Sequence, residues 1–278
     1  MSADYLTTDI EKTLRTSVPA QSYALDTPQT ITEEELKKWC GSATDITSYY
    51  RLEADIDLSD DGNWTPIGNA TTNRVQGRFI GTFDGDGHTI TGLTSNSGGD
   101  FGLFRTIGEG GVVKNMNISC NISGNGGFKG GIAANNYGTI ENCHVSGTIS
   151  GSNRIGGIAG YNTYTTTSGA QIIACSNTAS INGTDDVGGI CGDNNKSTVL
   201  ACYNIGEIKK DSENGGAICG YNRGTVTSCY YTKGTGVGTQ VTEWNDAIDD
   251  MNSALQTAGY SYQYELGSNE LPVIKTME

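Results

Sequence analysis

Apolar and polar residues alternate along several short stretches in the middle of the chain. In one stretch, every second position is small or apolar: Cys143, Val145, Gly147 and Ile149. The positions between them are polar: His144, Ser146, Thr148 and Ser150. Successive side chains of a β-strand point to opposite faces, so this pattern predicts a strand with an apolar inner face and a polar outer face. Residues 116–122 and 175–182 repeat the alternation, with Asn177 as an exception on the inner face.

Two short phrases recur through the same region. The first begins with small residues at positions 130, 156, 188 and 216 and ends six residues later in an asparagine. The second ends in Cys143, Cys175, Cys202 and Cys229. A fainter first copy covers residues 102–116. A repeat of roughly 20–50 residues indicates a solenoid, a propeller or an array.

The spacing of the copies selects among these architectures. Ile132, Ile158, Ile190 and Ile218 are separated by 26, 32 and 28 residues. A propeller blade needs about 40 residues, whereas a solenoid tolerates loops at its corners because each coil contacts only its neighbours. The 163–170 insertion is such a loop. We therefore predict an all-β parallel β-helix, in which equivalent residues stack from coil to coil.

Two columns of the repeat carry further expectations. The asparagines at 136, 162, 194 and 222 are predicted to stack and to bond to one another and to turn backbone. Each isoleucine at 132, 158, 190 and 218 is followed directly by another apolar residue, namely Ala133, Ala159, Cys191 or Cys219. Neighbouring residues of a strand point to opposite faces, yet both of these columns are apolar. Either the strand bends there, or one column lies under a cap or loop.

Four segments follow from the pattern along the chain. We expect an N-terminal arm at 1–28, a cap with the first coil at 29–78, β-helix repeats at 79–238 and a C-terminal cap at 239–278. Thr32 and Glu35 form a capping box that predicts a helix over 32–40. Thr242 is expected to start a second amphipathic helix that ends before Gly259, with short strands at 260–265 and 271–275. The two helices are predicted to cap the ends of the coil.

Charge and hydropathy exclude several functions. The 278 residues carry a formal net charge of −14, which disfavours nucleic acid and anionic membrane surfaces as partners. No run of 18 apolar residues predicts a transmembrane span. The first 30 residues contain no apolar signal-peptide core, so we expect either a signal that has been removed or another route of release.

Eight cysteines raise the questions of disulfides and metal. Most of them fall on interior positions of the repeat, where a free cysteine acts as a small buried apolar residue. The chain has no CxxC, and its two histidines do not group with cysteines at ligand spacing. We expect free thiols, no metal and no cofactor.

One family resemblance supports this interpretation. Its phrases are Asp55–Leu58, Trp64–Gly68, Phe79–Ile90 and Gly102–Phe104, followed by the repeats themselves. Together, over residues 31–233, they resemble bacterial surface proteins with GLUG repeats. The resemblance implies a right-handed β-helix in a secreted or surface-attached, adhesin-like protein, and it supplies no catalytic motif.

Asp84, Asp86 and His88 are the candidates for catalysis. They lie in one glycine-rich turn, where aspartate and glycine are favoured for backbone reasons. We therefore interpret them as turn residues, interpret His144 as a solvated surface side chain, and expect no enzyme.

The outer face of the strands is the candidate binding surface. Its serines, threonines and asparagines between Asn117 and Asn182 predict a flat polar wall that serves solubility or contacts a glycan or protein partner. The wall candidates are Ser146, Thr148, Ser176 and Thr178, all expected to point outward and to tolerate lysine. Tyr161 and Tyr164, at the corner loop, are the alternative binding position.

These observations predict a non-catalytic extracellular or cell-surface interaction module that binds a glycan or a protein. Two other functions stay open, namely a phage-tail-type receptor-binding protein and a carbohydrate-active β-helix enzyme. The oligomeric state and the ligand are left open.

Overall fold

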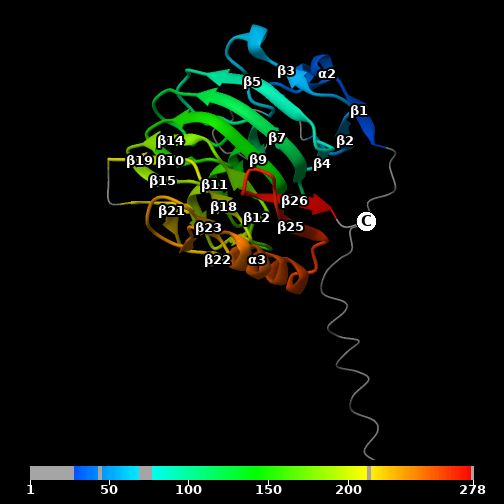
Figure 1. The fold of residues 1–278 in the computed structure, drawn as a ribbon. Coiled ribbons are helices and arrows are strands. Elements are labelled where there is room, and N and C mark those ends of the chain that lie inside the picture. The colour runs from blue at the N-terminus through cyan, green and yellow to red at the C-terminus, as the bar shows by residue number, and fades with distance from the viewer. Residues whose placement is uncertain (1–27, 43–45, 69–76, 212–213, 277–278) are drawn as a thin grey trace, which may run out of the picture.

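The computed structural model describes residues 28–42, 46–68, 77–211 and 214–276. The predicted arm at 1–28 therefore lies outside the described residues, apart from Pro28. Strands are the main secondary structure of the described chain, and they stack in layers (Figure 1). The helices are α2 (Glu33–Lys38), α3 (Asn245–Thr257) and the short 3-10 helix η1 (Ser59–Asp61).

Sixteen of the strands form one large sheet. Its main path runs through β1 (Gln29–Ile31), β2 (Tyr49–Leu52), β4 (Thr82–Asp84), β7 (Val112–Ile122), β9 (Thr139–Ser150), β13 (Ser176–Asn177), β18 (Tyr203–Asn204), β23 (Tyr230–Tyr231) and β24 (Thr239–Gln240). Beside this path lie β3 (Ile56–Asp57), β5 (Thr89–Ser95), β12 (Gln171–Ile173), β14 (Ser180–Gly183), β17 (Thr198–Leu200), β19 (Ile208–Lys210) and β22 (Thr225–Thr227).

Three smaller sheets complete the fold. One contains β10 (Asn153–Gly156), β15 (Asp185–Gly188) and β20 (Gly215–Gly216). The next contains β6 (Phe104–Ile107), β8 (Ala133–Asn136), β11 (Ala159–Thr163), β16 (Cys191–Asn195) and β21 (Cys219–Asn222). The last is the antiparallel hairpin of β25 (Tyr262–Leu266) and β26 (Pro272–Thr276).

The strands of the repeats pair in parallel with the equivalent strands of the neighbouring repeats. Ala133 lies opposite Ala159, which lies opposite Cys191, which in turn lies opposite Cys219. Cys143 lies opposite Met116 in the pairing of β7 with β9. The repeated phrases are thus stacked in register, as the sequence predicted, and the arrangement of parallel sheets is β-helix-like.

The two apolar columns of opposite parity are explained by a bend. β10 ends at Gly156 and β11 begins at Ala159, so the chain passes from one sheet to another across Gly157 and Ile158. Ile158 and Ala159 are both fully buried. A Cβ atom on Gly157 would lie 2.3 Å from the Gly189 carbonyl oxygen, which explains the glycine at this corner.

The stacked asparagines form a hydrogen-bonded ladder, as predicted. Asn136 Nδ2 donates to Asn162 Oδ1 at 2.9 Å, and Asn162 Nδ2 donates to Asn194 Oδ1 at 2.9 Å. Asn194 Nδ2 donates to Asn222 Oδ1 at 2.8 Å. We call these four residues the asparagine ladder. Asn177, the exception on the inner face, is fully buried and donates to Asn204 in a shorter ladder of the same kind.

The interior core contains the cysteine column. Cys143, Cys175, Cys202 and Cys229 are all buried to 2% exposure or less. All eight cysteines of the chain are unbridged in the structure. Burial raises the pKa of the Cys120 thiol to about 12. Seven of the eight cysteines are buried, and Cys40 is half-buried at the edge of the interior core.

Helix α2 begins at the predicted capping box. Glu35 N donates to Thr32 Oγ1 at 3.4 Å, and Thr32 N donates to Glu35 Oε2 at 3.1 Å. Leu36 is fully buried, and Trp39 packs against the interior core. The helix ends at Lys38, close to its predicted end.

Helix α3 differs from the prediction in its start and its position. Thr242 is not its N-cap; Trp244 takes that position and makes no side-chain capping hydrogen bond. The apolar face of the helix packs against Ile173 and Leu200, on the outer face of β12 and β17. The predicted end cap is therefore not confirmed for α3, because these contacts place it on the side of the large sheet (Figure 1).

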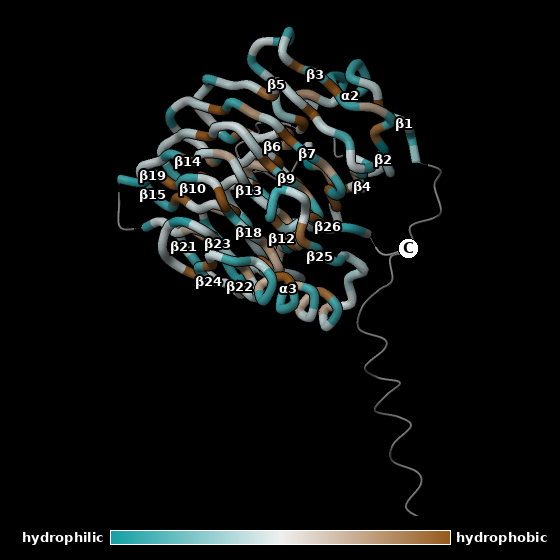
Figure 2. Tube along the Cα trace, viewed as in Figure 1, coloured by the Kyte–Doolittle hydropathy of each residue, from teal (hydrophilic) through white to brown (hydrophobic). Residues whose placement is uncertain are grey.

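The C-terminal segment has its own apolar core. Met251 and Leu255 of α3 join Tyr262 and Tyr264 of β25 in a cluster separate from the interior core. Hydrophobic and hydrophilic positions alternate along the strands and around α3 (Figure 2). The predicted strands at 260–265 and 271–275 are present as β25 and β26.

Candidate functional site

The polar outer face of the large sheet is stacked in rows. Asn117 lies opposite His144, His144 opposite Ser176, and Ser176 opposite Tyr203. A parallel row runs from Asn121 through Thr148 to Ser180. The wall predicted from the alternation is thus present. Its surface, however, is divided between a part that faces solvent and a part that lies beside the C-terminal hairpin.

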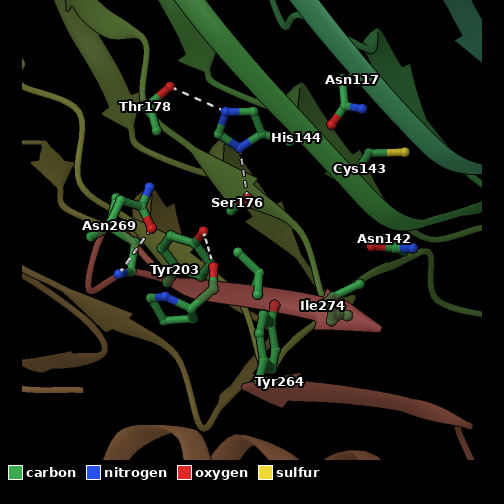
Figure 3. Close-up of a pocket in the computed structure, with 14 residues that line it drawn as sticks. Asn117, Asn142, Cys143, His144, Ser176, Thr178, Tyr203, Tyr264, Asn269 and Ile274 are labelled. Atoms are coloured by element: carbon green, nitrogen blue, oxygen red, sulfur yellow. Dashed lines mark hydrogen bonds between the residues drawn. The ribbon is translucent and has the colours of Figure 1, made fainter. Parts of the chain in front are cut away.

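A cleft of about 380 Å³ lies between this wall and the β25–β26 hairpin (Figure 3). The sheet side is lined by Asn117, Asn142, Cys143, His144, Ala174, Ser176, Thr178 and Tyr203. The hairpin side is lined by Tyr264, Asn269, Leu271, Pro272, Val273 and Ile274. None of these residues is an aspartate, glutamate, lysine or arginine, so the cleft is uncharged apart from the titration of His144.

Two hydrogen bonds anchor the hairpin over the sheet. Tyr203 Oη donates to the Pro272 carbonyl oxygen at 2.7 Å, and Tyr264 Oη donates to the Ala201 carbonyl oxygen at 2.8 Å. Both tyrosine side chains are buried, and each hydroxyl donates to a backbone carbonyl, as buried polar groups require. The cleft is therefore held open by a fixed wall and a fixed hairpin.

His144 is at the centre of a chain of hydroxyl groups in the cleft (Figure 3). Its Nδ1 lies 2.8 Å from Ser176 Oγ, and its Nε2 lies 3.3 Å from Thr178 Oγ1. The Thr178 hydroxyl also lies 3.3 Å from the Val145 carbonyl oxygen, which can only accept. Because the one proton of the Thr178 hydroxyl is directed to this carbonyl, the hydroxyl oxygen accepts from the Nε2–H of His144. This network assigns the tautomer of His144 in which Nδ1 carries no hydrogen and accepts a hydrogen bond from the Ser176 hydroxyl.

The environment of His144 corrects its interpretation as a solvated surface side chain. The residue is half-buried and has both ring nitrogens within hydrogen-bond distance of hydroxyl oxygens. Burial lowers the pKa of the imidazole below its ordinary value, because charge is costly away from water. The neutral ring therefore prevails at pH 7.

The four wall candidates do not share one environment. Thr148 is exposed and donates to Asn121 Oδ1 at 2.8 Å, and the half-buried Ser146 donates to the Ile118 carbonyl oxygen. Thr178 is half-buried in the cleft, and Ser176 is only 8% exposed. The expectation that all four lie exposed on the wall is therefore wrong for Ser176, which lies beneath the hairpin, and a lysine at this position is expected to destabilise the fold.

The alternative candidates Tyr161 and Tyr164 lie apart from the wall. Tyr161 belongs to β11 in another sheet, where the Arg154 guanidinium lies 4.6 Å from its ring centre. Tyr164 is 40% exposed, with Lys196 Nζ 4.7 Å from its ring centre. The structure does not bring these tyrosines together with the cleft.

The turn candidates for catalysis are bound to separate partners. Asp84 accepts from Asn115 Nδ2 at 3.0 Å and lies 3.5 Å from Lys114 Nζ. Asp86 pairs with Arg51, and His88 Nδ1 lies 3.1 Å from Asp55 Oδ1. These pairings fit the interpretation as turn residues.

The hairpin side of the cleft was missed from the sequence. A signal was nevertheless present on the sheet. Where one repeat has Glu141 and Asn142 on the outer face, the next two have Ile173–Ala174 and Leu200–Ala201. Apolar residues at outward positions of two adjacent repeats indicate that another part of the chain covers them.

Within the described ranges, no group of three or more His, Cys, Asp or Glu side chains could hold a metal ion. Over the same residues, no helix has the length and apolar character needed to cross a membrane.

Comparison with known families bears directly on the repeat. Residues 130–150, which span β8 and β9, match the family described as "The GLUG motif". The chain carries a GLUG motif. This match confirms the resemblance found in the repeated phrases.

Two curated proteins are similar to about one third of the chain. A "Putative Gly-rich membrane protein" of Evansella cellulosilytica is 36% identical over 102 residues, 33% of this chain and 11% of that protein. "Halomucin" of Haloquadratum walsbyi is 40% identical over 103 residues, 34% of this chain and 1% of that protein. The chain thus spans only a small part of the length of either relative.

A solved structure is similar over most of the chain. The crystal structure described as "a putative immunoglobulin A1 protease from Bacteroides ovatus" superposes with a TM-score of 0.64. The match covers 91% of this chain and 93% of that one, at 17% sequence identity. At this identity the likeness shows the fold alone.

Proposed function

We propose that the chain is a right-handed parallel β-helix that serves as a non-catalytic extracellular interaction module and binds a neutral glycan. The observation that carries the proposal is the uncharged cleft between the polar wall and the C-terminal hairpin. The names of the relatives, a membrane protein and a halomucin, favour a place at the cell surface.

The chemistry of the cleft favours a neutral ligand with many hydroxyl groups. The rest of the molecule is strongly acidic, with a net charge of −14, yet no carboxylate lines the cleft. Among the described residues, the Asn117 and Asn142 side-chain oxygens accept no hydrogen bond, and Asn269 Nδ2 donates none. These groups can accept from and donate to sugar hydroxyls.

The two sides of the cleft suit the two kinds of surface on a sugar ring. The sheet supplies amides and hydroxyls, and the hairpin supplies Leu271, Pro272 and the 38% exposed Val273. A volume of 380 Å³ lies near the lower end of ligand pockets, which span about 300–1,000 Å³. The cleft therefore fits one or two sugar units, and a longer chain would extend over the open wall towards Thr148.

Affinity for one such chain is expected to be modest. Each hydrogen bond contributes about 0.5–1.5 kcal/mol after its exchange with water. Strong attachment would then come from several modules on one surface, because linked sites bind with a high effective concentration.

One observation favours a carbohydrate-active enzyme as a second candidate. Ser176 Oγ lies 2.8 Å from His144 Nδ1 inside the cleft, and in the tautomer assigned above it donates to that nitrogen, which is the contact that a nucleophile makes with its base. The orienting group on Nε2 is the Thr178 hydroxyl, not a carboxylate. A neutral orienting group stabilises an imidazolium poorly, so binding without turnover is the preferred function.

A glycan array with the full chain tests the proposal. Wild type should bind neutral oligosaccharides, and Val273→Trp should abolish binding by filling the cleft. Leu266→Trp, on the same hairpin but outside the cleft, is the matched control and should bind as wild type. Binding that survives Val273→Trp would contradict the cleft as the site, and release of sugar products by wild type would favour the enzyme.

A further inference from the structure

At the C-terminal end of the parallel sheets, β21 and β22 are among the strands that have a partner on one side only. β21 pairs with β16, and β22 pairs with β17; no other described strand pairs with either. Together with the corner between them they form the segment 219–227, which we call the terminal edge. An edge strand presents a row of backbone N–H and C=O groups without partners, and such a row can pair with another chain.

The asparagine ladder ends at this edge with unused donors. In the three earlier rungs, each amide nitrogen donates to the next asparagine and to a carbonyl oxygen of the next repeat. Asn194 Nδ2, for example, donates to Asn222 Oδ1 at 2.8 Å and to the Thr225 carbonyl oxygen at 3.4 Å. Asn222 Oδ1 is occupied by Asn194 and by Gly224 N. No described residue accepts from Asn222 Nδ2, so both of its protons are unpaired within the described chain.

The rest of the strand end is covered, which limits the open segment. Ala217 N donates to the Thr235 carbonyl oxygen at 2.7 Å, and Val237 packs against the interior core. The loop after β23 thus covers the interior before β21 begins. Tyr221, at 42% exposure, and the exposed Thr225 and Thr227 are left accessible.

The terminal edge lacks the usual protection against pairing. Natural edges are often blocked by lysines, prolines or inward-pointing charges. Residues 219–228 contain no proline, and their one charged side chain is Arg223. Its guanidinium lies 2.9 Å from the buried Asp193 carboxylate, to the side of the strand. The edge is therefore chemically open to a further strand.

We propose that the terminal edge binds an extended strand from a second polypeptide that carries the same repeat. The register of the existing repeats specifies the direction and the key residues of the added strand. It lies parallel to β21, its asparagine accepts from Asn222 Nδ2, and a small residue precedes this asparagine by three positions, as Ala133, Ala159, Cys191 and Cys219 do. A small residue is also needed two positions before the asparagine, because a Cβ atom on Gly220 would lie 2.3 Å from the Asp186 carbonyl carbon.

A peptide of residues 216–228 with Cys219→Ser is the probe for this site. Labelled with fluorescein and titrated with the full chain, it should give saturable fluorescence anisotropy. The same peptide with Asn222→Leu should bind about tenfold more weakly, because it loses the acceptor of the ladder bonds. In the full chain, Asn222→Leu should weaken binding similarly, and Asn121→Leu on the open wall should leave it unchanged.

Amide hydrogen exchange provides a measurement that needs no variant of the protein. The saturating peptide should slow exchange in residues 219–227 and leave the outer wall unchanged. Absence of saturable binding to wild type, protection confined to other segments, or equal affinity of the Asn222→Leu peptide would each overturn the proposal. The glycan result is independent, because the cleft lies on the outer face of the sheet and not at the terminal edge.

Discussion

The outer face of the large sheet has two parts with opposite surroundings. In the covered part, Ile173 and Leu200 lie beneath α3 and join its apolar core. In the open part, Asn121 and Thr148 face solvent and hydrogen-bond to each other. Both parts belong to the same large sheet.

The difference shows that the repeat determines only its inner side. Interior positions must fit the neighbouring repeats above and below, so they carry the same small or branched residues in each copy. Outer positions depend on what lies outside, which is helix α3 in one part and water in the other. The cleft lies where these two surroundings meet, and it combines polar residues from the sheet with apolar residues from the hairpin.

The largest effect should come from removing the cover. Leu255→Asp places a carboxylate in the apolar core between α3 and the sheet, where Leu255 is fully buried. We expect a loss of about 5 kcal/mol of unfolding free energy for this core, or local detachment of the helix. Chemical denaturation and binding of a hydrophobic dye measure the two outcomes. Gln256→Asp, on the exposed side, is the control; a similar loss there would contradict a sealed cover.

A break in the asparagine ladder should be the next largest effect. Asn162→Leu leaves Asn136 Nδ2 and the Asn194 side-chain oxygen without their ladder partners inside the fold. The cost should be about 3 kcal/mol, because buried polar groups without partners are unstable. Asn121→Leu, the same change on the open part, should change the midpoint of thermal unfolding little. Equal effects of the two variants would show that the ladder is not a buried network.

Lysine substitutions on the wall should distinguish the covered part of the outer face from the open part. Ser176→Lys introduces a charge beneath the hairpin and should lower the unfolding free energy by about 2 kcal/mol. Thr148→Lys, on the open part, should stay within about 0.5 kcal/mol of wild type. Thermal unfolding followed by circular dichroism compares them. An unchanged unfolding free energy for Ser176→Lys would mean that the hairpin does not cover Ser176 in solution.

The pH dependence of hairpin docking should be the smallest effect. Burial lowers the pKa of His144 below 6.5, so the folded protein binds this proton less readily than the unfolded chain. The resulting stability is present above pH 6.5 and is lost as the pH falls towards the lowered pKa. Hydrogen exchange in β26 should accelerate across this range, and His144→Gln should remove that step. A step that persists in the variant would assign it to another group.

Regular features of the sequence were enough to predict the stacked parallel strands. Alternation after Cys143 identified the inner and outer faces, and recurrence of Asn136 and Cys143 identified the stacking. The capping box at Thr32 predicted the start of α2. Each of these features depends on local chemistry that repeats or is complete within a few residues.

Long-range contacts were not predictable in the same way. The hairpin reaches the sheet through contacts such as that of Tyr203 with Pro272, 69 residues later, and no repeat encodes such a pairing. The burial of Ser176 and the hydrogen bonds of His144 follow from this docking, so parity alone placed both residues in solvent. The position of α3 was mistaken for the same reason, although Ile173 and Leu200 carried a signal for it.

The asparagine ladder also determines where such a chain can change its length during evolution. Successive rungs are 26, 32 and 28 residues apart, yet each pair forms the same hydrogen bond. The longest interval contains the corner segment 163–170, where the extra residues leave the ladder and the next strand in register. This corner thus accommodates extra residues without breaking the ladder. The same change within a strand would shift every later side chain to the opposite face, so variation in length is confined to the corners.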